Sequence, residues 1–184
     1  MNINIVDLLP IQQKVNSVVS EKLETDLTSQ NYILAFNIEL FEYFNAIGVW
    51  KWWKHNHVIE KEKVLDELAD CFAFFLSAVI YQDQNAMFEN KDLVSPKVEK
   101  ELNDIFVNIE KYRKESDMTD HEVIDDLITY VGTDNEDKGV VSVERFAIAI
   151  FIATILFEKI TWEEITEAYR KKSNVNIKRQ RENY

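Results

Sequence analysis

Two nearly all-apolar segments of this chain each carry a pair of carboxylates three residues apart. Glu39 and Glu42 lie within residues 31–45, and Glu67 and Asp70 lie in the next apolar segment. Both segments are typical of buried helices, and on a helix an i,i+3 pair projects from one face. Buried like charges repel each other, and no Lys or Arg lies within one turn of the first pair. The fold must therefore compensate for four clustered carboxylates.

A divalent cation removes this repulsion, and a site made of oxygen donors alone suits Mg²⁺. The alternative is that the carboxylates line a solvent-facing stripe. Two such pairs on successive apolar helices favour the cation. The sequence therefore predicts a Mg²⁺ site formed by Glu39, Glu42, Glu67 and Asp70.

The fold class follows from turn residues and periodicity. The chain has 184 residues but only 3 Gly and 2 Pro, too few to form the many tight turns of a β-sandwich or an open α/β sheet. Apolar residues recur at i, i+3 and i+4 spacing. We expect one all-α domain, residues 1–184, with seven helices at about 6–23, 29–47, 60–82, 95–114, 119–132, 143–158 and 161–172.

The cellular compartment is predicted from sequence features that are absent. A single cysteine, Cys71, excludes a disulfide framework and indicates a reducing compartment. The first residues have no basic region, and no stretch approaches 18 uncharged apolar residues. We expect a soluble, cytoplasmic protein without a membrane partner.

Charge is distributed unevenly along the chain. The formal net charge of −12 argues against direct nucleic-acid binding, which needs clustered Lys and Arg. Basic residues nevertheless crowd the last fifteen positions: Arg170, Lys171, Lys172, Lys178, Arg179 and Arg181. Residues 173–184 are predicted to form a flexible basic tail that closes over a small polyanion. A solvated chain end is the alternative.

Two further segments each allow two interpretations. Residues 83–139 hold many of the acidic residues and are predicted to form a helical insertion, with two additional bundle helices as the alternative. Residues 143–157 are apolar around most of a helix, which indicates either a homodimer interface or a wholly internal core helix.

The spacing of these motifs resembles that of a known enzyme superfamily. Glu-x-x-Glu on one helix and Glu-x-x-Asp on the next is the pattern of the all-α NTP pyrophosphatases, which include MazG-like enzymes and the dimeric dUTPases. Residues 50–54, Trp-Lys-Trp-Trp-Lys, resemble the dimeric dUTPase segment after the first pair. The closing motif of that family is matched by Lys172, Asn176, Arg179, Gln180 and Tyr184, and its first motif by Gln12 and Asn16.

The resemblance spans residues 12–184 except 83–139, and it implies a dUTP diphosphatase of phage or bacterial type. Such an enzyme hydrolyses dUTP, and also dUDP, to dUMP with Mg²⁺ and thereby limits uracil incorporation into DNA. Three positions depart from the family pattern: Ser173 replaces Asn, Asn183 replaces Gly, and Ala73 replaces a frequent His. Losing that His affects contacts to the base or sugar.

Residue roles follow from the resemblance. Glu42 or Glu67 is expected to act as the general base, and all four carboxylates as metal ligands. Trp53 either stacks on the base or packs against its neighbours. The expected substrate-binding residues are Gln12, Asn16, Lys51, Trp53, Lys172, Asn176, Arg179 and Tyr184.

Other functions remain possible from the sequence. Within the enzyme class the alternative is a dCTPase/dUTPase or a broader MazG-like pyrophosphohydrolase. Outside it, the chain is interpreted as an acidic helical protein whose residues 83–139 bind a regulatory partner protein, such as a DNA-binding regulator. Activity and partner binding are compatible with each other.

Overall fold

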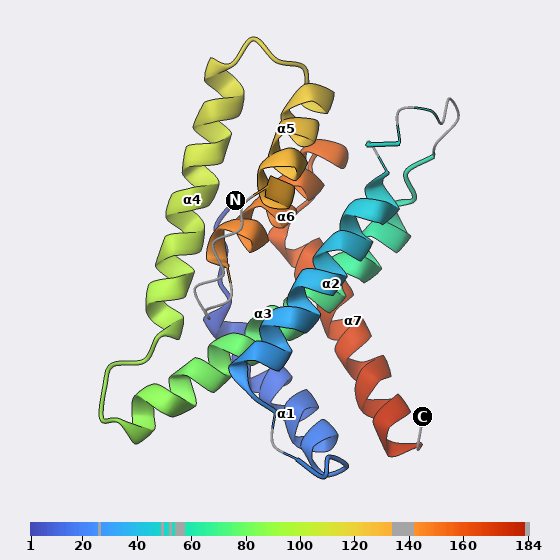
Figure 1. The fold of residues 1–184 in the computed structure, drawn as a ribbon. Coiled ribbons are helices and arrows are strands. Elements are labelled where there is room, and N and C mark those ends of the chain that lie inside the picture. The colour runs from blue at the N-terminus through green and yellow to red at the C-terminus, as the bar shows by residue number, and fades with distance from the viewer. Residues whose placement is uncertain (26, 49, 52, 54–57, 134–141, 183–184) are drawn as a thin grey trace.

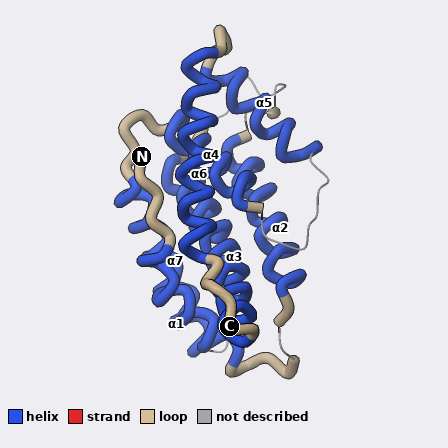
Figure 2. The backbone as a smooth tube through the Cα atoms, turned by 90° about the vertical axis from the view of Figure 1, so that its left-hand side faces the viewer, coloured by secondary structure: helices blue, strands red, loops and turns tan. Residues whose placement is uncertain are grey.

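The structure is a computed structural model that describes residues 1–25, 27–48, 50–51, 53, 58–133 and 142–182, and it is helical (Figure 1). A short 3-10 turn, η1 (Val6–Leu8), precedes seven α-helices. These are α1 (Leu9–Ser20), α2 (Ser29–Ile47), α3 (Lys61–Phe88), α4 (Ser95–Glu115), α5 (Asp120–Thr133), α6 (Val143–Leu156) and α7 (Trp162–Arg181). The described residues contain no strand (Figure 2), so the predicted all-α class is confirmed.

Helix ends are set by local capping chemistry. Thr28 and Asn31 form a capping box at the start of α2, and Gly48 ends that helix with a φ of 66°, which favours glycine. The predicted capping box at α5 is present, since Glu122 accepts the Thr119 N–H at 2.7 Å. These boundaries agree with the sequence prediction.

Two helices extend beyond the predicted ends. α3 continues past Gln82 to Phe88, and the Asp83 carboxylate accepts the backbone N–H groups of Val94 and Ser95 at 2.6 and 2.9 Å. Asp83 therefore stabilises the start of α4 from within a helix instead of opening a loop.

α7 was predicted to end near Lys172, but it runs to Arg181. Its helical face continues because Tyr169, Ser173 and Ile177, each four residues apart, are all buried. The predicted helix end was therefore wrong: residues 173–181, expected to belong to a basic tail, continue α7, and Ile177 is only 8% exposed.

α6 is the central helix of the core. Every residue from Phe146 to Ala153 is buried, and the Phe146 ring stacks on Phe75 with centroids 4.0 Å apart. Burying a phenylalanine contributes about 1.5–3 kcal/mol, so this pair stabilises the packing of α6 on α3. The apolar character of residues 143–157 is explained by an internal helix, not by a dimer interface.

The two helices of the predicted insertion join the same core. Val98, Phe106 and Val123 are buried in it, and α4 packs mainly against α6. Asn103 on α4 also accepts the Ile3 N–H at 2.9 Å and donates to the Ile3 carbonyl at 2.7 Å. Residues 134–139 lie outside the described residues, and the assignment of 83–139 as an insertion stays a prediction.

The remaining helices form the other half of the bundle. α2 and α3 pack along each other as an antiparallel pair, and α7 packs against both α3 and α1. In both views α1 lies at the end of the molecule where α7 terminates (Figures 1 and 2). None of the described helices is long and apolar enough to cross a membrane.

Candidate functional site

Three of the four predicted carboxylates meet where α2 packs on α3, and Glu42 is not among them. One carboxylate oxygen each from Glu39, Glu67 and Asp70 lies within 4.8 Å of the others. The α2 backbone is held in register next to this cluster because the buried Tyr43 O–H donates to the Ala149 carbonyl of α6 at 2.8 Å. Three converging oxygens fit a divalent cation that prefers oxygen ligands.

Burial and mutual repulsion disfavour the charged form of this cluster. Burial, followed by the charges of Asp70, Glu42 and Glu67, raises the pKa of Glu39 to about 7. Burial, followed by the charges of Asp70 and Glu42, also raises the pKa of Glu67. Glu42 is exposed at the edge of the cluster, where its charge reaches both residues. The protein thus holds negative charge at a cost that a bound cation would offset.

An ammonium group from α7 partly compensates the cluster. Lys172 Nζ lies 2.7 Å from Asp70 and 2.6 Å from Asp66, and its side chain is only 15% exposed. Burial alone would lower the pKa of Lys172, but the hydrogen bonds to Asp66 and Asp70 raise it overall. Burial raises the pKa of Asp70, against the opposing effect of Lys172. The Lys172 ammonium group therefore lies at one edge of the carboxylate cluster.

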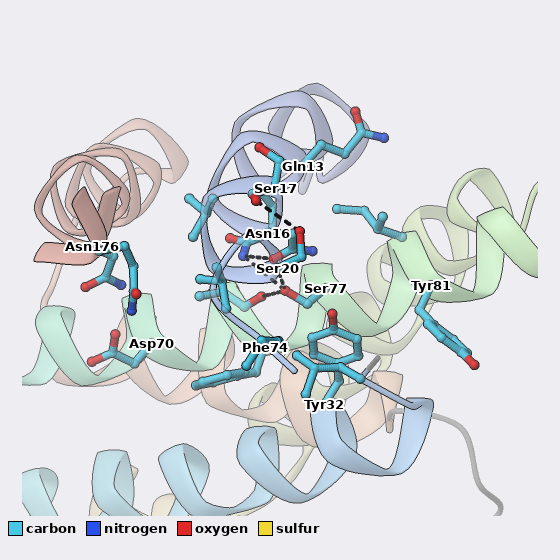
Figure 3. A pocket seen from close by; sticks show the side chains of 18 of the residues that line it. Gln13, Asn16, Ser17, Ser20, Tyr32, Asp70, Phe74, Ser77, Tyr81 and Asn176 are labelled. Atoms are coloured by element: carbon cyan, nitrogen blue, oxygen red, sulfur yellow. Dashed lines mark hydrogen bonds between the residues drawn. The ribbon is translucent and has the colours of Figure 1, made fainter. Parts of the chain in front are cut away.

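A cavity of about 940 Å³ opens from this cluster between α1, α2, α3 and α7. Figure 3 shows Asp70 and Asn176 facing each other at one side, Asn16 and Ser77 in the middle, and Tyr32 and Tyr81 at the other side. Lys172 contacts Asp70, the charge of Arg179 reaches it, and the α7 amides of Asn176 and Gln180 also line the cavity. The cavity therefore has an ionic end and an aromatic end.

The predicted substrate residues divide into two groups. Gln12, Asn16, Lys172, Asn176 and Arg179 all line the cavity. Gln12 is only 2% exposed, so it contributes the cavity wall from behind Asn16.

The other predicted residues are not brought into the cavity lining by the structure. Lys51 Nζ donates to the Asn45 carbonyl at 2.9 Å, and Trp53 packs edge-to-face on Trp50 at 5.4 Å. Tyr184 lies outside the described residues. Roles for these three residues stay predictions.

Three site residues were missed by sequence reasoning. Asp66 pairs with Lys172, and Phe74 and Ser77 line the cavity. Ser77 is the only hydroxyl group in the apolar run 71–80, which was an available signal. No sequence signal distinguished Phe74, because it resembles the core phenylalanines on either side of it.

The raised pKa of Glu39 predicts a pH-dependent effect of Glu39→Gln without divalent cations. In the wild type the group is protonated in both states at low pH, and its ionisation destabilises the fold between about pH 4.5 and pH 7. The variant cannot ionise. Its free energy of unfolding relative to wild type should therefore rise over this interval and level off above pH 7.

Urea unfolding in EDTA at pH 5, 6, 7 and 8 measures this difference. Glu101→Gln, at an exposed position on α4, is the control, and its difference from wild type should vary less. A Glu39→Gln difference that stays constant across the series would contradict the prediction.

The geometry agrees with a comparison to known protein families. A family profile described as dUTPase matches residues 4–184, which is nearly the whole chain. None of the curated proteins compared matches the chain. The match includes α4 and α5 as well as the helices that carry the cavity.

Proposed function

This chain belongs to the all-α dUTPase family and is a dUTP diphosphatase, and from that premise we propose how its residues act. The family generally uses a divalent metal ion. We propose that the ion is Mg²⁺ and that Glu39, Glu67 and Asp70 hold it, with Glu42 as a fourth ligand or as the base. The observation that carries this proposal is the convergence of three carboxylate oxygens within 4.8 Å beside a cavity lined by basic residues.

The residues around the cluster suit the triphosphate. When bound, Mg²⁺ neutralises charge on the phosphate oxygens of the substrate. Lys172 and Arg179 add positive charge on the same side, and Asn176 offers an amide donor. Charge-assisted hydrogen bonds of this type orient phosphates strongly.

The reaction needs a base near the attacking water. Hydrolysis of dUTP to dUMP and pyrophosphate cleaves the link between the α- and β-phosphates, and the water loses a proton. Glu42 is the preferred base because it is exposed next to the cluster, where solvent reaches it; Glu67 is the second choice.

The substrate range is tested by product analysis. Purified protein is incubated with dUTP, dUDP, dCTP, dTTP or ATP, with Mg²⁺ or with EDTA. We expect pyrophosphate and dUMP from dUTP, and dUMP with orthophosphate from dUDP, only when Mg²⁺ is present. Equal turnover of all triphosphates would instead support a broader MazG-like pyrophosphohydrolase, and orthophosphate from dUTP would contradict the proposal.

We also propose a homodimer, now through α2. Leu34, Ile38 and Phe41 are 61%, 50% and 50% exposed and follow each other at i, i+4 and i+7 on one helix face. Such a stripe is typical of a helix that packs against a partner. Its position on the helix that carries Glu39 and Glu42 would link assembly to the metal site.

Ile38→Glu is therefore expected to shift the protein from dimer to monomer, because a charge would be buried in the interface. Light scattering at micromolar concentration measures the mass. Val107→Glu, on the exposed side of α4, is the matched control and should remain dimeric. A wild type that shows only a 21.7 kDa species would remove the dimer proposal.

Binding of a regulatory partner protein through 83–139 stays a prediction. Several acids on α4 pair with a lysine one turn away, including Asp104 with Lys100 and Glu110 with Lys114. Charge reversal of the exposed acids should remove binding and spare turnover if the prediction is right.

A further inference from the structure

A buried hydrogen-bond network lies behind the middle of the cavity. The Tyr169 O–H donates to Gln12 Oε1 at 2.9 Å. Gln12 Nε2 donates to Asn16 Oδ1 at 2.8 Å and to Ser77 Oγ at 3.0 Å. The Ser77 O–H lies within donating distance of Asn16 Oδ1, at 2.9 Å, and of the Ala73 carbonyl, at 2.7 Å. The network thus links α7, α1 and α3.

The chemistry of the network gives it a direction. Burial raises the pKa of Tyr169 to about 12, so its hydroxyl keeps its proton at neutral pH. Gln12 Oε1 accepts a hydrogen bond from this hydroxyl, so the Gln12 NH₂ group points toward Asn16. If the Gln12 side-chain amide were rotated by half a turn, its NH₂ group would face the Tyr169 hydroxyl. The buried Tyr169 O–H would then lose its hydrogen-bond acceptor, which is costly.

The same logic determines which atom of Asn16 is left for a ligand. Asn16 Oδ1 accepts from Gln12 at 2.8 Å and lies 2.9 Å from the Ser77 hydroxyl, so this oxygen is turned toward the wall and away from the cavity. The remaining polar atom, Nδ2, can only donate. Asn16 is half-buried on the cavity wall, in line with Asp70 and Asn176 on one side and Tyr32 on the other (Figure 3).

We propose that Tyr169 and Ser77, through Gln12, hold Asn16 so that its NH₂ group faces the nucleobase and selects a carbonyl over an amino group. Uracil presents a carbonyl oxygen at C4, whereas cytosine presents an amino group there. A fixed donor therefore pairs with uracil and meets a second donor on cytosine. This inference rests on the proposed function, since it places the base in the cavity beside the metal site.

The position of the network within the cavity supports this assignment. The triphosphate has its natural place at the ionic end, next to Asp70, Lys172 and Arg179. The base then lies toward the uncharged part, where Phe74 offers an aromatic side chain near Asn16 and Ser77 (Figure 3). Tyr169 and Ser77 are positioning residues, because neither needs to touch the substrate.

The test compares substrates within each variant. kcat/KM is measured with Mg²⁺ for dUTP, dCTP and dTTP in wild type, Tyr169→Phe and Ser77→Ala. We expect wild type to prefer dUTP over dCTP by at least about 100-fold. Each variant should lower that preference about tenfold, because Asn16 becomes free to rotate its amide. All substrates carry the same triphosphate, so a general loss of activity cancels in the ratio.

Thymine provides an internal control, because it presents the same C4 carbonyl as uracil. The dUTP:dTTP ratio should therefore stay unchanged in both variants. Ser77→Thr keeps the hydroxyl and should restore the dUTP:dCTP preference. Tyr43→Phe removes another buried phenol hydrogen bond, next to Glu42 but outside the network, and should also keep that preference.

The outcomes separate this inference from the proposed function. A wild type that hydrolyses dUTP, with Tyr169→Phe and Ser77→Ala retaining its full dUTP:dCTP preference, overturns the inference alone. Equal shifts in the dUTP:dCTP and dUTP:dTTP ratios overturn it too, because they indicate a loosened pocket. Affinities for dUMP and dCMP, measured by calorimetry, test the same preference without turnover. A network-dependent binding preference in a protein that releases no pyrophosphate from dUTP would support the inference and overturn the catalytic assignment.

Discussion

Glu39→Gln, Glu42→Gln, Glu67→Gln and Asp70→Asn are each expected to lower kcat for dUTP hydrolysis by about two orders of magnitude or more. The physical reason is the loss of a cation ligand or of the base that accepts the proton of water. Three of the four groups converge within 4.8 Å, and the charge of Glu42 reaches Glu39 and Glu67. Steady-state turnover at saturating dUTP and Mg²⁺ measures the effect.

The three glutamate variants should not lose stability in the absence of metal, whereas Asp70→Asn also removes the ion pair with Lys172. Each glutamate substitution removes one member of a repelling cluster, so the free energy of unfolding in EDTA should stay equal or rise. Glu62→Gln, an exposed carboxylate in the first turn of α3, is the matched control and should retain wild-type turnover. Four variants with near-normal rates would show that the metal site has been assigned to the wrong residues.

Lys172→Met is expected to lower kcat/KM for dUTP by about 10- to 150-fold, which corresponds to the 1.5–3 kcal/mol of a hydrogen bond to a charged group. In the described structure Lys172 Nζ contacts Asp70 and Asp66 at the ionic end of the cavity. Methionine retains an apolar side chain of similar length and removes only the charge. The loss should therefore appear in substrate binding and in turnover together.

Lys171→Met is the control for this prediction. Lys171 is the adjacent residue on α7 and carries the same charge, but it is exposed. Its substitution should change kcat/KM less than about twofold, because exposed charges contribute little at physiological salt. If both variants show the same loss, net charge rather than a specific contact at the site is responsible.

The proposed dimer interface lies on α2 and not on α6 for a physical reason. An apolar helix has the same sequence pattern whether its second face meets a partner subunit or the interior of its own chain. The structure buries both faces of α6, since α3, α4 and α5 all pack against it. α2 shows the opposite pattern: its apolar sequence predicts a buried helix, yet Leu34, Ile38 and Phe41 are exposed.

The sequence by itself determined the helices and the spacing of the carboxylates at the candidate site. Periodicity and capping residues predicted seven helices, and the boundaries of α2 and α4 agree with the structure to about one residue. The two i,i+3 carboxylate pairs followed from sequence as well, because helix geometry places residues three apart on one face whatever the tertiary fold. Local rules suffice where the determining contacts are local.

Only the tertiary structure decided how these parts meet. The distance between Glu39 and Asp70 depends on how α2 packs on α3, and the contact of Lys172 with Asp66 joins residues 106 positions apart. The extension of α7 likewise depends on burial of Ile177 by other helices. Free energy from such packing overrides the weak propensity of a polar, basic segment. Ser77 is a further example, because its partners Gln12 and Asn16 lie more than 60 residues away in the sequence. Its hydrogen bonds therefore form only in the packed bundle.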